Sequence, residues 1–273
     1  MDVQFVKLSP TQNMTILVES PVPRENHMRV AHELMRYDGV FAEQVGFIEP
    51  AERAEAWARL QMMGGEFCGN ATMSLAALLA VDRRITPGQP MDIPLEASGT
   101  DALVMVGVTR QGTSVACSLE MPPPDSVENH LLPLDGREYP VAVVSLEGIT
   151  HIIVHAGLIT GDITAFAEKA MEEWQTRFTA DAVGIMVYDQ ASKYMTPLVF
   201  VRSTQSRVWE RGCGSGTAAV GAWLAQTAAS TITADIAQPG GIITVTGEYA
   251  ENAVRRITIK GTVRLVARGT AYL

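Results

Sequence analysis

A five-residue motif that occurs twice constrains the fold of this chain more than any other feature. Residues 68–72 read CGNAT and residues 213–217 read CGSGT, and each motif precedes a proline-free segment rich in alanine. Residues 45–47 (VGF) and 183–185 (VGI) also match, at a slightly shorter spacing, which implies a short insertion in the second copy. Repeated motifs in the same order predict a duplicated supersecondary unit. We therefore expect two related halves.

The pattern of apolar, glycine and proline residues has the same order in both halves. In the first half it predicts strands at residues 3–8, 14–19, 44–49 and 57–63 and helices at 23–38 and 69–82. In the second half it predicts strands at residues 141–146, 151–156, 183–189, 198–209, 242–248, 256–260 and 263–267 and helices at 163–178 and 214–228. This order predicts a mixed α/β (α+β) fold of two pseudo-symmetric domains.

A run of three prolines marks the boundary between the halves. Residues 121–125 read MPPPD, and three consecutive prolines continue neither a helix nor a central strand. The polar stretch that follows runs to about residue 135. We therefore predict a first domain at residues 1–121, a linker at 122–135 and a second domain at 136–261.

Composition excludes several classes of partner. The net charge is −9 and the sequence pI is about 5.1, whereas nucleic acids and anionic membranes attract clustered lysine and arginine. The sequence has neither an apolar stretch long enough to span a membrane nor a basic, then apolar, leader. Three cysteines do not make a disulfide framework. We expect a cytoplasmic protein with free thiols, and the default assembly is a twofold homodimer.

The two motif cysteines point to acid–base chemistry. Cys68 and Cys213 are each predicted to stand at a helix N-terminus, where free N–H groups and the helix dipole lower a thiol pKa from about 8.5 toward about 3.5–7.5. The same N–H groups bind carboxylates. Two related helix ends therefore predict a racemase or epimerase in which one thiolate removes an α-proton and the other thiol protonates the opposite face. Cys117 lies in a strand-like segment and is predicted to be core.

Other readings of these motifs are weaker. Residues 212–216 (GCGSG) lack the spacing of a dinucleotide-binding loop. His151 and His155 have the spacing of a zinc pair only on a helix, and their segment reads as a strand. No lysine lies in a recognisable pyridoxal phosphate setting. We expect no metal and no cofactor, and we expect His151 to be a hydrogen-bonded core histidine. A non-catalytic small-molecule binding protein is the alternative from another class.

The two cysteine motifs resemble those of the diaminopimelate epimerase-like, cofactor-independent racemases. The resemblance rests on residues 66–70 (EFCGN) and 213–216 (CGSG), and it extends over nearly the whole chain. It implies two pseudo-symmetric α/β domains, each with a β-sheet or barrel wrapped round a central helix. It also implies that the C-terminal strand, residues 262–273, returns to the first domain.

Within this family the chain is most similar to the histidine racemases of opine-type metallophore biosynthesis. The likeness rests on residues 13–18 (NMTILV), 43–49 (EQVGFIE), 66–74 (EFCGNATMS), 213–218 (CGSGTA) and 238–241 (QPGG). It implies Cys68 and Cys213 as the catalytic pair. Substrate contacts are expected from Asn13, Glu43, Gln44, Gly69, Asn70, Glu210, Arg211, Gly214, Ser215 and Gly216. An imidazole needs a hydrogen-bond acceptor, and Glu43 could provide it.

The sequence departs from true diaminopimelate epimerases at several positions. Ala71 replaces a glycine of their first motif, and Glu210-Arg211-Gly212 directly precedes Cys213, a short spacing that resembles the proline racemases. The asparagines that hold the far end of diaminopimelate have no counterparts near residues 148–151 or 181–183. A shorter substrate is therefore expected. Diaminopimelate and proline or hydroxyproline remain the alternative substrates, and the phenazine-type isomerases lack the cysteine pair.

Overall fold

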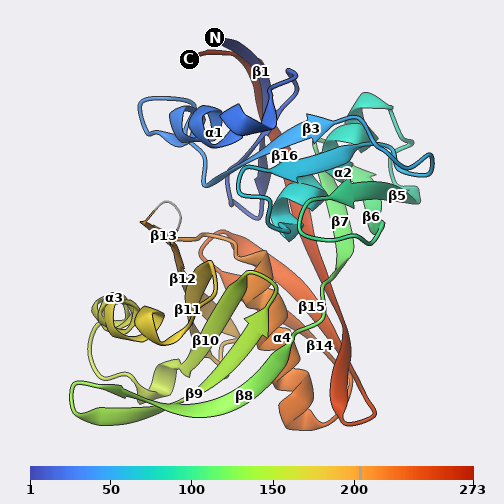
Figure 1. Cartoon of the computed structure of the whole chain (residues 1–273). Helices are drawn as coiled ribbons and strands as arrows, with labels where there is room; N and C mark the ends of the chain where they lie inside the picture. Colours follow the sequence, from blue (N-terminus) through green and yellow to red (C-terminus); the bar gives the residue numbers. More distant parts are fainter. Residues whose placement is uncertain (203–204) are drawn as a thin grey trace. The chain divides into compact units, whose positions relative to one another are not determined.

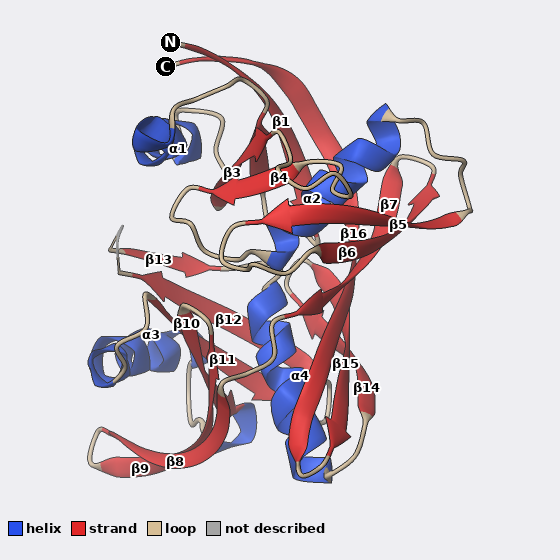
Figure 2. Cartoon of the chain, turned by 45° about the vertical axis from the view of Figure 1, so that its right-hand side comes forward, coloured by secondary structure: helices blue, strands red, loops and turns tan. Residues whose placement is uncertain are grey.

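The chain forms two units, and each is built around one buried helix. The first unit comprises Met1–Glu120 and Lys260–Leu273, and the second comprises Met121–Ile259. The computed structural model describes residues 1–202 and 205–273. Figures 1 and 2 show the strands and helices of each unit. Within the described residues, no helix has the length and apolar character needed to cross a bilayer.

The first unit contains seven strands, two α-helices and the end of the last strand of the chain. Its elements are β1 (Asp2–Pro10), β2 (Thr15–Val18), η1 (Arg24–Asn26), α1 (His27–Met35), β3 (Gln44–Glu49), β4 (Arg59–Met62), α2 (Gly69–Asp82), β5 (Pro90–Ala97), β6 (Val104–Gln111), β7 (Ser114–Met121) and the final part of β16 (Ala253–Tyr272). The predicted helix at 23–38 is thus a short 3-10 turn followed by α1. The segment 57–63, predicted as a strand, contains β4.

The strands of the first unit close into a ring. They follow the order β1 to β7, then β16, which pairs again with β1. Asp2 lies opposite Tyr272, so the two chain ends are neighbours, as Figure 1 shows. The crossover through α1 makes β2 and β3 parallel, with Thr15 opposite Gln44. This parallel pairing brings the start of β2 next to the start of β3.

The helix α2 fills the interior of this ring. Every residue of α2 except Leu79, Val81 and Asp82 is buried. A helix that is apolar or small on all sides can only be stable when it is enclosed. Its alanines, glycine and serine allow the surrounding strands to approach closely. The predicted helix at 69–82 is confirmed, and Figure 2 shows α2 among the strands.

The second unit repeats this order with one addition. Its elements are β8 (Ser126–Leu134), β9 (Arg137–Leu146), β10 (Ile149–His155), η2 (Ala156–Leu158), α3 (Ile163–Trp174), η3 (Gln175–Arg177), β11 (Ala182–Asp189), β12 (Tyr194–Val201), β13 (Ser206–Trp209), α4 (Gly214–Ala228), β14 (Ile232–Gln238), β15 (Gly241–Ala250) and the start of β16. The predicted helix at 214–228 is confirmed. The helix predicted at 163–178 ends as α3 at Trp174.

Strand pairing confirms the duplication. The parallel pair β2–β3 around α1 corresponds to the parallel pair β10–β11 around α3. The antiparallel pairs β3–β4 and β5–β6 correspond to β11–β12 and β14–β15. The strand β13, a hairpin partner of β12, has no counterpart in the first unit and lies where the insertion was expected. The predicted strand at 198–209 is therefore two strands, and its residues 203 and 204 lie outside the described residues.

The segment predicted as a linker is mostly a strand. Residues 126–134 form β8, which pairs with β9 along its whole length and belongs to the second unit. Within the predicted linker, only the proline-rich residues 122–125 and the turn residue Asp135 are outside the strand. The segment looked like a linker because residues 128–131 in the middle of β8 are exposed and include Glu128, Asn129 and His130, as an outer strand can.

Candidate active site

Cys68 caps the central helix of the first unit. Its backbone is extended (φ −133°, ψ 108°), and its Sγ atom accepts a hydrogen bond from the Ala71 N–H at 3.5 Å. Its carbonyl oxygen accepts from both the N–H and the hydroxyl of Thr72. The thiol therefore stands at the positive end of the α2 dipole, as predicted. Gly69 and Asn70, two predicted substrate contacts, are the first two residues of α2 and are buried.

A chain of side-chain hydrogen bonds runs from Cys68 to Glu43. The thiol donates to Gln44 Oε1 at 2.9 Å, and Gln44 Nε2 donates to Asn13 Oδ1 at 2.6 Å. Asn13 Nδ2 donates in turn to Glu43 Oε2 at 2.9 Å. The structure thus brings together Asn13, Glu43, Gln44 and Cys68, four residues that the sequence singled out separately.

Local backbone structure explains why these residues meet. Thr11 and Gln12 adopt left-handed conformations (φ 47° and 61°) in the turn after β1, and the Asn13 N–H donates to Pro10 O. This turn places Asn13 just before β2, whose first residue pairs with Gln44 in the parallel ladder. Asn13 is 1% exposed, so its amide needs partners within the protein. Gln44 and Glu43 provide them.

Cys213 caps the central helix of the second unit in the same way. Its backbone is extended (φ −94°, ψ 107°), and its Sγ atom accepts from the Gly216 N–H at 3.2 Å and lies 3.6 Å from Ser215 Oγ. The Thr217 hydroxyl donates to the Cys213 carbonyl at 2.6 Å, as Thr72 does to Cys68. The two thiols therefore occupy equivalent positions in the two units.

Two features of the second motif hold Cys213 in place. Gln238 on β14 accepts from the Cys213 N–H at 2.7 Å and donates to Thr217 Oγ1 at 2.8 Å. Gly216 leaves room for these side chains, because a Cβ atom there would lie 2.3 Å from Met186 Sδ and 3.0 Å from Cys213 Sγ. Sequence reasoning assigned no role to Gln238 or Thr217. The sequence held two signals for them: Gln238 begins the QPGG motif, and Thr217 matches Thr72 in the repeated motif.

The pKa of Cys213 shifts in the direction opposite to the prediction. Burial raises the pKa of this thiol well above its usual value, and the neighbouring Glu210 carboxylate, which accepts its hydrogen bond, raises it further. The Ser215 hydroxyl and the Gly216 N–H oppose this shift less strongly. The predicted lowering by the helix N-terminus is therefore wrong for Cys213, because the side chain is only 2% exposed and loss of solvent outweighs the dipole.

The remaining predicted contacts lie next to Cys213. Gly214 is the first residue of α4, and the Glu210 N–H donates to Pro197 O. Arg211 Nη2 donates to the carbonyl of Pro239 at 3.0 Å, which ties the residues before Cys213 to the turn after β14. This contact gives Arg211 a structural role in the second unit.

His151 is a core residue, as predicted, but without the expected hydrogen bonds. It is fully buried on β10, and neither ring nitrogen has a hydrogen-bond partner among the described residues. Burial lowers the pKa of His151 to about 3. A Cβ atom at Gly184 would lie 2.3 Å from its Nδ1 atom, so glycine at that position leaves room for the ring. The imidazole is neutral at physiological pH.

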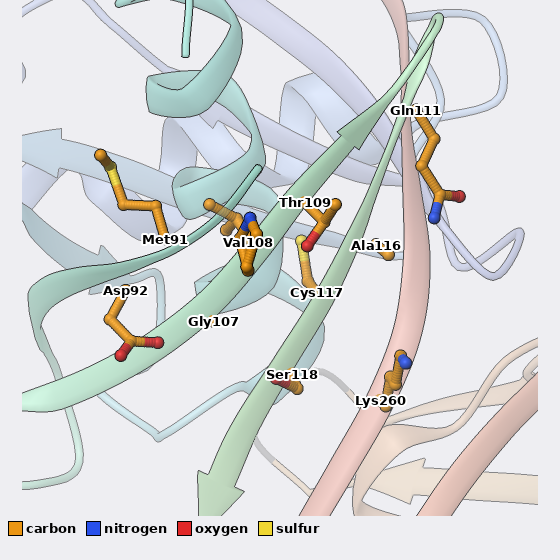
Figure 3. Close-up of a pocket in the computed structure, with 11 residues that line it drawn as sticks. Met91, Asp92, Gly107, Val108, Thr109, Gln111, Ala116, Cys117, Ser118 and Lys260 are labelled. Carbon is orange, nitrogen blue, oxygen red and sulfur yellow. The ribbon is translucent and has the colours of Figure 1, made fainter. Parts of the chain in front are cut away.

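Cys117 and the cavity beside it are separate from this chemistry. Cys117 is 1% exposed, its thiol donates to Met73 O, and burial raises its pKa to about 12. A cavity of about 310 Å³ is lined by β5, β6, β7 and Lys260, with Thr109 and Ser118 on neighbouring strands (Figure 3). None of the predicted site residues lines it. Among the described residues, no cluster of three His, Cys, Asp or Glu could hold a metal ion.

Comparison with known proteins places the chain in a family. The family described as "Histidine racemase CntK N-terminal domain" matches residues 2–272. The chain belongs to this histidine racemase family. The histidine racemase of Staphylococcus aureus (strain Mu50) is 30% identical over 99% of this chain and 98% of its own length. The histidine racemase of Fusobacterium nucleatum subsp. nucleatum (strain ATCC 23726) is 30% identical over 99% and 97%, respectively.

Solved structures confirm the fold of this histidine racemase family member. A hydroxyproline epimerase from Agrobacterium vitis covers 100% of the chain, with 93% of its own length matched, a TM-score of 0.76 and 14% identity. A phenazine biosynthesis protein of the PhzF family from Bacillus anthracis covers 100% of both chains, with a TM-score of 0.68 and 13% identity. The expected fold family and the expected enzyme class, an amino-acid racemase and therefore an isomerase, are confirmed.

Proposed function

We propose that this protein interconverts L-histidine and D-histidine, with Cys68 and Cys213 as the two acid–base residues. The observation that carries this proposal is the pair of cysteines that cap equivalent helices, one in each unit, in a chain of the histidine racemase family. A binding protein would have no use for two thiols placed at duplicated helix N-termini. A two-base racemase needs two acid–base groups, and the duplication supplies two equivalent thiols.

The proposed reaction needs only proton transfers. One cysteine, as thiolate, removes the α-proton, and the electron pair passes into the substrate carboxylate as an enolate. The other cysteine, as thiol, delivers its proton to the opposite face, so the configuration inverts and the two residues exchange protonation states. The N–H groups in the first turns of α2 and α4 suit the extra negative charge on the carboxylate, because they lie at the positive ends of the helix dipoles. For the reverse reaction the roles exchange.

Assembly and location are also proposals. We propose that the protein works in the cytoplasm, since free thiols are compatible with a reducing compartment. We further propose a twofold homodimer, the commonest assembly of soluble enzymes. Light scattering during gel filtration would measure the mass, and a value matching the 29.5 kDa chain would contradict the dimer.

Hydrogen exchange at the α-carbon tests the function directly. The purified protein is incubated in deuterated water with L-histidine, L-proline or LL-diaminopimelate, and the products are followed by NMR and chiral chromatography. Deuterium should enter histidine together with the appearance of D-histidine. Exchange with another amino acid alone would keep the mechanism and reject histidine as substrate. No exchange with any of the three would reject the enzyme.

We propose that Glu43 recognises the imidazole. Its carboxylate already accepts from Asn13, and a carboxylate has further lone pairs for an imidazole N–H. Glu43→Ala should therefore lower the ratio of kcat/KM for histidine to kcat/KM for other amino acids by about tenfold, the effect of one charge-assisted hydrogen bond of about 1.5 kcal/mol. Competition assays with paired substrates measure this ratio directly. An unchanged ratio would show that another residue recognises the imidazole.

A further inference from the structure

The hydrogen-bond chain that ends at Cys68 has only one consistent direction. An ionised carboxylate only accepts hydrogen bonds, so Glu43 must face the amide nitrogen of Asn13. The Asn13 oxygen is then turned toward Gln44 and must receive the Gln44 amide nitrogen, at 2.6 Å. The Gln44 oxygen is consequently left facing Cys68, at 2.9 Å. The charge on Glu43 thus sets the orientation of both amides.

Thr15 strengthens this orientation. Its hydroxyl donates its only proton to the backbone carbonyl of Asn13, at 3.3 Å. Its oxygen is therefore available as an acceptor for the second N–H of Gln44, at 2.8 Å. Both protons of the Gln44 amide are used in this way, and Thr15 is fully buried.

We propose that the chain Glu43–Asn13–Gln44 holds Cys68 in its protonated form in the free enzyme. A carbonyl oxygen at 2.9 Å stabilises S–H and repels a thiolate. The Ala71 N–H favours the thiolate, but its distance of 3.5 Å makes it the weaker contact. Asn13 and Gln44 are therefore positioning residues. This inference rests on the contacts around Cys68 and does not depend on the proposed function.

The acceptor beside the other thiol is chemically different. Cys213 donates to the carboxylate of Glu210, which can take the proton, whereas Cys68 donates to an amide, which cannot. Burial and the Glu210 carboxylate both raise the pKa of Cys213, and the Gly216 N–H at 3.2 Å opposes this shift less strongly. The two half-sites thus differ although their helices are equivalent: an amide oxygen accepts from Cys68, and a carboxylate accepts from Cys213.

Titration of Cys68 by alkylation tests the proposal without any measurement of turnover. The rate of iodoacetamide modification is measured against pH, and the modified cysteine is identified by peptide mass spectrometry. Glu43 is linked to Cys68 by hydrogen bonds through Asn13 and Gln44. Glu66 is a second carboxylate of this unit and lies two residues before Cys68 in the sequence. Glu66→Gln is therefore the matched control for the loss of one negative charge.

Three variants distinguish the effect of hydrogen-bond direction on the Cys68 midpoint from the effect of losing one negative charge. Glu43→Gln removes the constraint on Asn13, so both amides can turn and present N–H to the sulfur; the alkylation midpoint should fall by about 1 pH unit, which makes Cys68 about tenfold more reactive below the midpoint. The double variant Asn13→Asp/Glu43→Gln moves the carboxylate from position 43 to position 13, where it contacts Gln44 directly. It again forces the Gln44 nitrogen away from Cys68 and should restore the wild-type midpoint. Glu66→Gln should shift the midpoint by less than half as much as Glu43→Gln.

Each result decides the proposal. A Glu43→Gln shift no larger than that of Glu66→Gln would overturn it, as would a double variant that keeps the midpoint of Glu43→Gln. Circular dichroism establishes that each variant is folded. If a variant does not fold, the wild type still decides, since its Cys68 midpoint should lie above the value of about 8.5 for free cysteine, and a lower midpoint overturns the proposal. A racemase with a low Cys68 midpoint would refute the inference and leave the proposed function intact.

Discussion

Replacement of either motif cysteine by serine is expected to lower histidine racemisation by about 10²–10⁴-fold, the contribution of one positioned acid–base group. A hydroxyl is far less acidic than a thiol, so Cys68→Ser and Cys213→Ser each remove one of the two proton carriers while keeping nearly the same volume. The loss should appear as a fall in kcat, since the binding N–H groups of α2 and α4 remain. Chiral chromatography of the histidine product measures the rate.

Cys117→Ala is the control for these two variants. It removes the third thiol, which lies in the core of the first unit and donates only to backbone carbonyls. Racemisation by this variant should stay close to the wild-type rate, with some loss of stability from the vacated volume. Racemisation that survives in Cys68→Ser or Cys213→Ser, or that disappears equally in Cys117→Ala, would contradict the two-thiol mechanism.

The second large effect is expected at Gly99, a residue distant in sequence from both motifs. Gly99 has φ +75°, and a Cβ atom there would lie 2.2 Å from Phe67 N and 2.7 Å from the carbonyl carbon of Glu66. Backbone atoms cannot rotate away as a side chain can, so Gly99→Ala must move the segment just before Cys68. A displacement of about 1 Å at a reacting group costs about 10²-fold in rate, and we expect kcat to fall by that factor.

Gly112→Ala separates this contact from backbone strain. Gly112 also has a positive φ, +61°, but a Cβ atom there would meet nothing within 4 Å. Both variants should lose about 1–2 kcal/mol of unfolding free energy from the left-handed conformation, and Gly99→Ala should lose more because of the clash with Phe67. Only Gly99→Ala should also lose activity. Urea unfolding and racemase kinetics on both proteins measure the two effects, and equal activities would refute the argument.

The central helices could be predicted from sequence because their signals are local. The residues 69–82 and 214–228 form α2 and α4 with the predicted bounds. Each begins after an extended cysteine whose sulfur accepts an N–H three residues later, which is ordinary N-cap geometry. The duplication was visible for the same reason: both copies need the same capping residues and the same small side chains to fit inside a ring of strands.

Features set by the environment of a side chain were predicted less well. The sequence indicated low thiol pKa values from the helix dipole, but burial and Glu210 raise the pKa of Cys213. It indicated a hydrogen-bonded core histidine, but the ring nitrogens of His151 have no partner among the described residues. Solvent exposure depends on every segment that packs around a residue, so a local motif does not determine it.

The sequence by itself determined the duplicated α/β fold, the two capping cysteines and the racemase family, because these depend on spacing and on residues adjacent in the chain. Only the tertiary structure decided how the first thiol is held. The parallel pairing of β2 with β3 joins Asn13, Gln44 and Cys68 across distant parts of the sequence. The direction of their hydrogen bonds follows from one carboxylate that can only accept, and that constraint exists only where the folded chain brings these side chains into contact.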